Sequence, residues 1–401
     1  MRPSCFQRSA GKGSKRDLLF PKYILLLILL SFTKETVFAL EFFRLGAISV
    51  GGWSTPFSVN ANGSVVVGYS DNRAFRWSDS TGMQNLGLVS SLDSQSGAHG
   101  VSANGEVVVG FSSDNSGSAG STKSFMWSQT GGMQVLDSYN FLGTPMGIGG
   151  DGNVVCGTGG GGGGARWTAT TGTQRLNEGI PSSGGVADFQ FAFPRAISSD
   201  GNFLVGGGSL SGTSRAYRWS MSGGTQLLPS TSLLVPHTAK GVSADGSVSI
   251  GYGIDNNGRE TAFRWDQAGG LLSLGTLGTE SHMMGSIANS VSGDGLAVVG
   301  ESANQAFIWS AANGMQSLQT LLTNQGIDLS GWKLSTATAI SLDGSTIVGS
   351  AVKSIRTGTG KQGITTTYTE AFVVRGIPEP SSLSLLALGG VVVALGRRRG
   401  I

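Results

Sequence analysis

The segment GVSADGSVSIGYG, residues 241–253, decides the fold, because variants of it recur along most of the chain. Its centre is an Asp-Gly pair that lies between two short segments rich in strand-forming residues. Such a pair is typical of a β-hairpin with a two-residue type I′ turn, in which both turn residues have positive φ. The segment therefore predicts one antiparallel hairpin.

The hairpin pattern recurs seven times, which makes an internal repeat the main feature of the sequence. Each copy has an Asp-Gly or Asn-Gly pair at its centre, and successive glycines are 42, 47, 49, 45, 49 and 49 residues apart. The predicted turn glycines are Gly63, Gly105, Gly152, Gly201, Gly246, Gly295 and Gly344.

An aromatic strand follows each hairpin, as in Ala262-Phe263-Arg264-Trp265, and a Gly-rich turn and a fourth strand come next. The seventh copy, Ala371-Phe372-Val373-Val374, has Val in place of Trp. One Trp at the same position of each unit favours packing between neighbouring units, with sugar stacking as the alternative. The predicted packing residues are Trp77, Trp127, Trp167, Trp219, Trp265 and Trp309.

Four strands in a repeat of about 47 residues predict a propeller blade. The seventh unit lacks its fourth strand, whereas Phe43-Arg44-Leu45-Gly46, before the first hairpin, resembles a closing strand such as Leu274-Gly275. We therefore predict an all-β, seven-bladed β-propeller over residues 40–376. The N-terminal strand would complete the last blade and leave no open end in the array. An open β-solenoid is the alternative, and it would not need this strand.

Composition agrees with short strands and tight turns, since 66 of 401 residues are Gly and only 13% are charged. Much of the positive charge lies in the two ends of the chain, so the body is mildly acidic. A body without a stripe of Lys and Arg lacks the electrostatic features of a nucleic-acid-binding protein. We therefore expect no nucleic-acid partner.

Residues 1–39 are predicted to be a signal peptide. Basic residues such as Lys22 precede an apolar run over Tyr23–Phe32, and Val37-Phe38-Ala39 offers a cleavage site after Ala39. The run is short for a membrane span of about 20 residues, although an uncleaved signal anchor is the alternative. We expect signal peptidase to process the chain during export through the inner membrane.

Residues 377–401 contain three successive parts: a Pro-Glu-Pro motif, the apolar stretch Leu383–Gly396, and three arginines. The apolar stretch predicts a transmembrane helix, and the arginines would keep their end in the cytoplasm. The proline-rich segment is extended and therefore accessible to a processing enzyme. A simple C-terminal membrane anchor is the alternative.

This arrangement resembles the PEP-CTERM sorting signal of Gram-negative bacteria. The resemblance implies recognition by an exosortase, a membrane cysteine transpeptidase, and therefore a transient membrane anchor before release to the cell surface or the medium. It assigns the recognition motif to Pro378, Glu379 and Pro380, and the cytoplasmic retention cluster to Arg397, Arg398 and Arg399.

The repeats over residues 43–374 also resemble the HAF family of extracellular repeats, through Ala-Phe pairs such as Ala262-Phe263. The initial His of that family is missing from every copy. The resemblance implies an extracellular location and a repeat architecture rather than an activity.

No catalytic or metal-binding constellation is predicted, and no cofactor. His99, His237 and His282 lie outside the repeated pattern without metal-ligand spacing. We expect them in exposed loops, and projection of one of them into the channel is the alternative. Cys156 stands where sister copies have Val, so we expect a small strand residue there.

We predict a non-enzymatic binding or structural module of the cell surface or matrix, with polysaccharide or surface proteins as partners. Exosortase systems resemble export routes tied to exopolysaccharide production, and this favours polysaccharide as the partner class by analogy only. Insertions at Asp114–Lys123, Gly179–Phe193 and Ile355–Thr369 are the expected sites of specificity. A glycan hydrolase or lyase with its active site at the channel mouth is the alternative, and it requires paired carboxylates or a His-carboxylate pair there.

Overall fold

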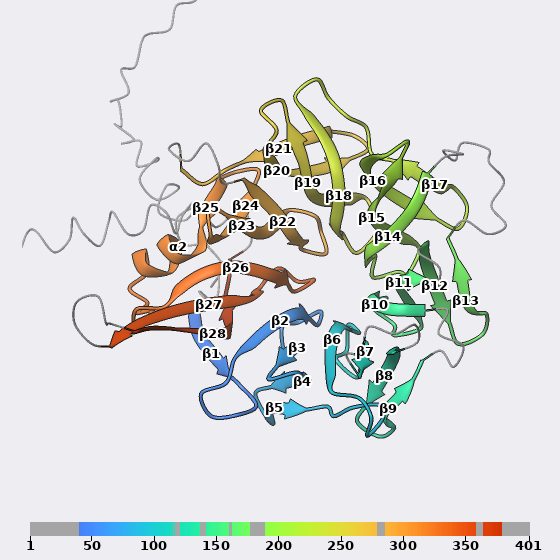
Figure 1. Ribbon diagram of the computed structural model, residues 1–401. Coiled ribbons are helices and arrows are strands. Elements are labelled where there is room, and N and C mark those ends of the chain that lie inside the picture. The colour runs from blue at the N-terminus through green and yellow to red at the C-terminus, as the bar shows by residue number, and fades with distance from the viewer. Residues whose placement is uncertain are drawn as a thin grey trace, which may run out of the picture. The chain divides into compact units, whose positions relative to one another are not determined.

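A computed structural model describes residues 40–114, 116, 121–136, 142–159, 163–176, 189–278, 285–357 and 364–378. These residues form seven four-stranded antiparallel sheets around a common centre, which confirms the predicted seven-bladed propeller (Figure 1). The predicted signal peptide and the tail from Glu379 onward lie outside the described residues.

In blades 1 to 6 the four strands pair in chain order, from the innermost strand outward (Figure 1). The first three blades are β2 (Ser54–Val59), β3 (Val65–Ser70), β4 (Arg73–Ser78) and β5 (Gly82–Asn85); β6 (Gln95–Val101), β7 (Val107–Ser113), β8 (Thr122–Ser128) and β9 (Gly132–Val135); and β10 (Leu142–Ile148), β11 (Val154–Gly159), β12 (Gly163–Thr168) and β13 (Gly172–Arg175). The next three are β14 (Phe189–Ile197), β15 (Phe203–Leu210), β16 (Thr213–Ser220) and β17 (Gly224–Leu227); β18 (Leu234–Val242), β19 (Val248–Asp255), β20 (Glu260–Asp266) and β21 (Gly270–Gly275); and β22 (Ser286–Val291), β23 (Ala297–Ser302), β24 (Gln305–Ser310) and β25 (Gly314–Ser317).

Blade 7 joins the two ends of the described chain. Its strands are β26 (Lys333–Ile340), β27 (Thr346–Thr357), β28 (Ile364–Arg375) and, outermost, β1 (Glu41–Gly46). β1 pairs antiparallel with β28, with Phe42 opposite Val374 and Phe43 opposite Val373. The N-terminal strand therefore completes the last blade, and the ring closes without an open blade.

The type I′ prediction for the Asp-Gly and Asn-Gly pairs is wrong. A five-residue loop joins the first two strands of every blade, and only the glycine of the pair has positive φ, as at Gly63 (φ 73°). Two-residue loops with positive φ at both positions occur instead between the second and third strands, at Asp71-Asn72, Ser211-Gly212 and Ala303-Asn304.

Side-chain hydrogen bonds explain why the longer loop is adopted. Ser243 donates its hydroxyl to Asp245 (2.7 Å) and accepts the backbone N–H of Val248 (2.9 Å). The Asp245 carboxylate in turn accepts the backbone N–H of Ser247 (2.9 Å). This N–H and the Ser243 and Ser247 hydroxyls lower the pKa of Asp245 to about 2. The Ser-x-Asp-Gly pattern is therefore a hydrogen-bonded turn, repeated at Ser198, Ser292 and Ser341.

The same seven loops form a closed ring of backbone hydrogen bonds, each loop donating to the loop of the next blade. Ala61 donates to Ala103, for example, and Gly293 donates to Leu342. The last bond of the ring runs from the Asp343 N–H to the carbonyl of Ala61 (3.1 Å). The ring fixes the seven first strands at one end of the propeller axis.

The repeated aromatic strand packs blade against blade. Trp219 belongs to a buried cluster with Cys156 and Leu176 of the preceding blade, and its indole N–H donates to the Leu176 carbonyl (3.1 Å). The neighbouring Arg218 donates to the Gly246 carbonyl of the following blade (3.1 Å). In blade 7, where Val374 stands in place of Trp, a cluster with Trp332 and the buried leucines of α2 (Leu318–Asn324) fills the interface.

Candidate functional site

A cavity of about 190 Å³ lies at the centre of the ring, lined by residues of all seven innermost strands and the loops that follow them. These strands are β2, β6, β10, β14, β18, β22 and β26, which surround the axis in Figure 1. All seven repeats therefore contribute to the lining of this one cavity.

A β-bulge in each innermost strand supplies the side chains that differ from blade to blade. The register shifts by one residue around a residue two positions before the end of every one of these strands, as between Ala98 and Gly100 of β6. Bulges commonly redirect a side chain at functional sites. The residues at this shared bulge all line the cavity, and they are Phe57, His99, Met146, Arg195, Lys240, Asn289 and Thr338.

The charged residues in this set are the cations of two adjacent blades. Lys240 donates to the side-chain oxygen of Asn289 (2.6 Å), which is neutral, and Asn289 donates to the Ala337 carbonyl (3.1 Å). Arg195 is exposed to the cavity and makes no side-chain hydrogen bond or ion pair with the described residues. The described lining contains no Asp or Glu.

Burial and the nearby Arg195 charge lower the pKa values of Lys240 and His99. Burial lowers the pKa of Lys240; Glu301 opposes this shift, and the Arg195 charge adds to it. Burial also lowers the pKa of His99; its hydrogen bond to the Pro145 carbonyl opposes the shift, and the Arg195 charge again adds to it. His99 is therefore neutral at pH 7.

Aromatic rings occupy the part of the cavity formed by blades 1 and 2. The Phe57 ring meets His99 edge-on at 5.1 Å between centroids, and His99 lies 5.4 Å from Phe111. Of these rings, Phe57 and His99 line the cavity, and Phe111 packs behind His99. The cavity thus has an aromatic part and a cationic part, contributed by different blades.

The expectation of exposed loop histidines is wrong for the two that are described. His99 lies on β6 and His237 on β18, and both are partly buried. His99 occupies the bulge position, where a side chain projects into the central cavity rather than outward. His282 lies outside the described residues.

The chain matches no protein-family model. No curated protein matches it either. Among solved structures it is similar to a TolB from Agrobacterium tumefaciens, at 15% identity and a TM-score of 0.40, over 58% of this chain and 87% of that one. It is also similar to TolB from Acinetobacter baumannii, at 13% identity and a TM-score of 0.40, over 68% of this chain and 64% of that one. We infer nothing about function from these likenesses.

The predicted turn, packing and sorting residues lie away from the cavity or outside the described ranges, whereas His99 lines the cavity. The seven turn glycines all have positive φ, and the repeated tryptophans lie between blades, with Trp167 and Trp265 only partly buried. None of these residues lines the cavity. Pro378 is described, whereas Ala39, Glu379, Pro380 and Arg397–Arg399 are not. Within the described ranges, no helix has the length and hydropathy needed to cross a membrane.

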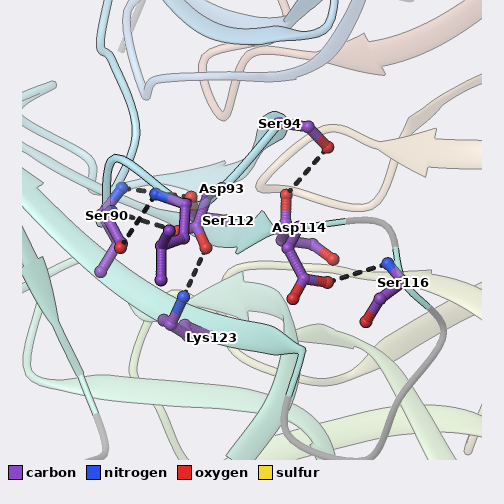
Figure 2. Close-up of polar contacts among 10 residues, drawn as sticks. Ser90, Asp93, Ser94, Ser112, Asp114, Ser116 and Lys123 are labelled. Atoms are coloured by element: carbon purple, nitrogen blue, oxygen red, sulfur yellow. Dashed lines mark hydrogen bonds and ion pairs between the residues drawn. The ribbon is translucent and has the colours of Figure 1, made fainter.

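The first predicted insertion is anchored by a buried ion pair (Figure 2). Lys123 of β8 contacts the Asp93 carboxylate, whose side chain is fully buried. Asp93 also accepts the Ser112 hydroxyl (2.7 Å) and the Ser90 backbone N–H (3.2 Å). These contacts tie the base of the β7–β8 hairpin to the connection from the preceding blade, which is a structural role.

The other insertions are described only in part. At Ile355–Thr369 the described residues are mostly strand, because β27 and β28 pair up to Thr357 and Ile364 as one long ribbon. The described part of this insertion therefore lengthens the β27–β28 hairpin of blade 7. Most of Gly179–Phe193 lies outside the described residues.

Apart from His99, the bulge residues that line the cavity were missed in the sequence. A signal was present, because each bulged residue lies five positions before the Asn or Asp of its turn, as Arg195 does before Asp200. Variable residues at a constant position within a repeat indicate a shared surface. This surface faces the propeller axis because of the bulge in each innermost strand.

The described part of the chain offers no cluster of three or more His, Cys, Asp or Glu that could hold a metal ion. Cys156 is fully buried in β11, and burial raises the pKa of its thiol to about 12. The thiol is therefore protonated at neutral pH and packs as a small apolar side chain.

Proposed function

We propose that the chain is an exported, exosortase-processed protein of the cell surface or matrix, and that its propeller is a non-enzymatic binding module. The ligand enters the central cavity, and exopolysaccharide is the partner class. The observation that carries the binding role is the set of seven different side chains at one repeated position, all lining one cavity.

The contrast between frame and lining supports this proposal. The frame residues recur from blade to blade and pack or close turns, as Trp219 and Ser243 do. The bulge position instead carries an aromatic ring, an amide, a thioether or a cation, according to the blade. A binding protein needs this combination, because a rigid frame holds varied contact groups in place.

No described feature favours the glycan hydrolase or lyase. Paired carboxylates are the usual requirement for glycoside hydrolysis, and the described lining of the cavity has none. His99 lies in the lining, yet its ring nitrogen contacts a backbone carbonyl rather than a carboxylate.

A screen of the purified full-length chain against immobilised neutral and acidic polysaccharides tests the binding role. We expect selective retention on at least one polysaccharide. Replacing the two apolar bulge residues, Phe57→Ser with Met146→Ser, should weaken retention about tenfold or more. The matched control replaces Leu92 and Leu233, which are exposed and outside the cavity, and should bind normally.

The same screen separates the two functions. Retention without new reducing ends in the bound polysaccharide agrees with a binding module. Release of reducing ends that the bulge variant abolishes would instead establish a glycan hydrolase or lyase. A folded protein that is retained by no polysaccharide would contradict the partner class.

The sorting step is tested by the mass of the C-terminal peptide of protein recovered from the native host. We expect a chain that has lost Arg397–Arg399, because exosortase would cut near Pro378-Glu379-Pro380. In a Glu379→Ala variant the full tail should remain. A wild-type protein that keeps all three arginines would contradict processing and favour a simple anchor.

A further inference from the structure

The cationic part of the cavity has no described counter-ion. Arg195 and Lys240 occupy equivalent bulge positions of blades 4 and 5, and both line the cavity. Arg195 has no described polar partner, and the Lys240 ammonium is held by the neutral amide of Asn289. The carboxylates that act on Lys240, Glu301 and Glu260, form no described ion pair with it.

Two like charges in a partly enclosed space repel each other, and the repulsion is poorly screened when water is limited. Burial and the Arg195 charge both act against the charged form of Lys240. A ligand with negative charge would relieve this repulsion and replace the missing counter-ion. Arginine in particular offers a planar fork of N–H donors, which suits carboxylate and phosphate oxygens.

We propose that the central cavity binds an oxyanion, a carboxylate or phosphate group, between Arg195 and Lys240, while the rest of the ligand contacts Phe57 and His99. This inference rests on the proposed binding role and specifies the chemistry of the ligand. The charged group faces blades 4 and 5. The apolar face of the ligand lies toward the aromatic part formed by blades 1 and 2.

The size of the cavity limits what can be bound. Its volume of about 190 Å³ is below the roughly 300–1,000 Å³ of sites for drug-sized ligands. It therefore accommodates a small anion or one charged unit of a longer chain. Both sources share the same oxyanion chemistry.

Isothermal titration calorimetry on the full-length chain tests the inference with four probes at one ionic strength: galacturonate, galactose, inorganic phosphate and a galacturonate oligomer. We expect binding of at least one anionic probe and none of galactose, its neutral counterpart. Binding of galacturonate or phosphate without binding of the oligomer would indicate that the ligand is a small free anion. Binding restricted to the oligomer would indicate a charged unit within a chain.

Two variants and one control assign the effect to the cavity. Arg195→Gln and Lys240→Gln should each weaken anion binding at least tenfold, about 1.4 kcal/mol. Arg195→Gln removes no described contact, so its fold should be intact. Lys333→Gln removes an exposed lysine of β26 outside the cavity and should bind as the wild type does.

Equal binding of galacturonate and galactose, or anion binding unchanged in both Gln variants, would overturn the inference. A protein that is retained by neutral polysaccharide yet binds no anionic probe would also overturn it, while leaving the proposed binding role intact. The lack of any binding in both experiments would overturn this inference and the proposed binding role together.

Discussion

Gly110→Ala is expected to lower the free energy of unfolding by about 3 kcal/mol, the upper part of the usual range for overpacking. A Cβ atom at Gly110 would lie 1.9 Å from the Gly97 carbonyl oxygen and 2.9 Å from the Ala98 Cα. Both contacts are with backbone, so no side-chain rotation can relieve them. The strand would have to move at the bulge that presents His99.

Chemical denaturation of the wild type and the variant measures this difference. Gly163→Ala is the matched control, because no atom lies within 4 Å of its added Cβ and its φ is not positive. We expect the control to change stability by less than about 1 kcal/mol. Equal stability of the two variants would show that the bulge does not require a glycine opposite it.

The same contact occurs in all seven blades, which links the frame to the site. In each case the added Cβ would approach a backbone oxygen of the innermost strand, as at Gly251, where it would be 2.0 Å from the Thr238 carbonyl. The glycine of the second strand is therefore needed by the bulge. The bulge, in turn, directs one variable side chain into the cavity.

A chain that begins at Ala47 is expected to be at least about 4 kcal/mol less stable than one that begins at Leu40. Removing β1 deletes Phe42 and Phe43, which pack on the cores of blade 7 and of its interface with blade 1. Large apolar side chains lost from such positions cost about 3–5 kcal/mol each when fully buried. Removing β1 also breaks the Arg44–Glu370 ion pair (2.7 Å). It leaves β28 as an exposed edge that favours aggregation.

Thermal unfolding of the two chains, monitored by light scattering, measures the loss of stability. A synthetic peptide of residues 40–46 should restore part of the melting temperature, because it binds the folded state alone. The same peptide with Ser in place of Phe42 and Phe43 should not. A chain from Ala47 with an unchanged melting temperature would show that closure by β1 contributes little.

The candidate site was the part least accessible from sequence. The sequence shows neither paired carboxylates nor metal-ligand spacing, and its insertions indicated specificity elsewhere. Arg195 and Lys240 each look like one charge among many. Both line the same cavity because the bulges of two separate blades place them there. A bulge adds one residue to a strand, which local sequence does not reveal in the absence of the pairing partner.

The amino-acid sequence is enough to predict the repeated frame: seven hairpins, an aromatic strand in each unit, and a first strand able to complete the last blade. These follow from local preferences that repeat with a period of about 47 residues. Three features needed the folded structure: the longer loop closed by Ser243 and Asp245, the innermost place of the strand before that loop, and the shared cavity lined by Arg195 and Lys240. Those outcomes depend on hydrogen bonds and packing between residues far apart in the chain, which no single repeat contains.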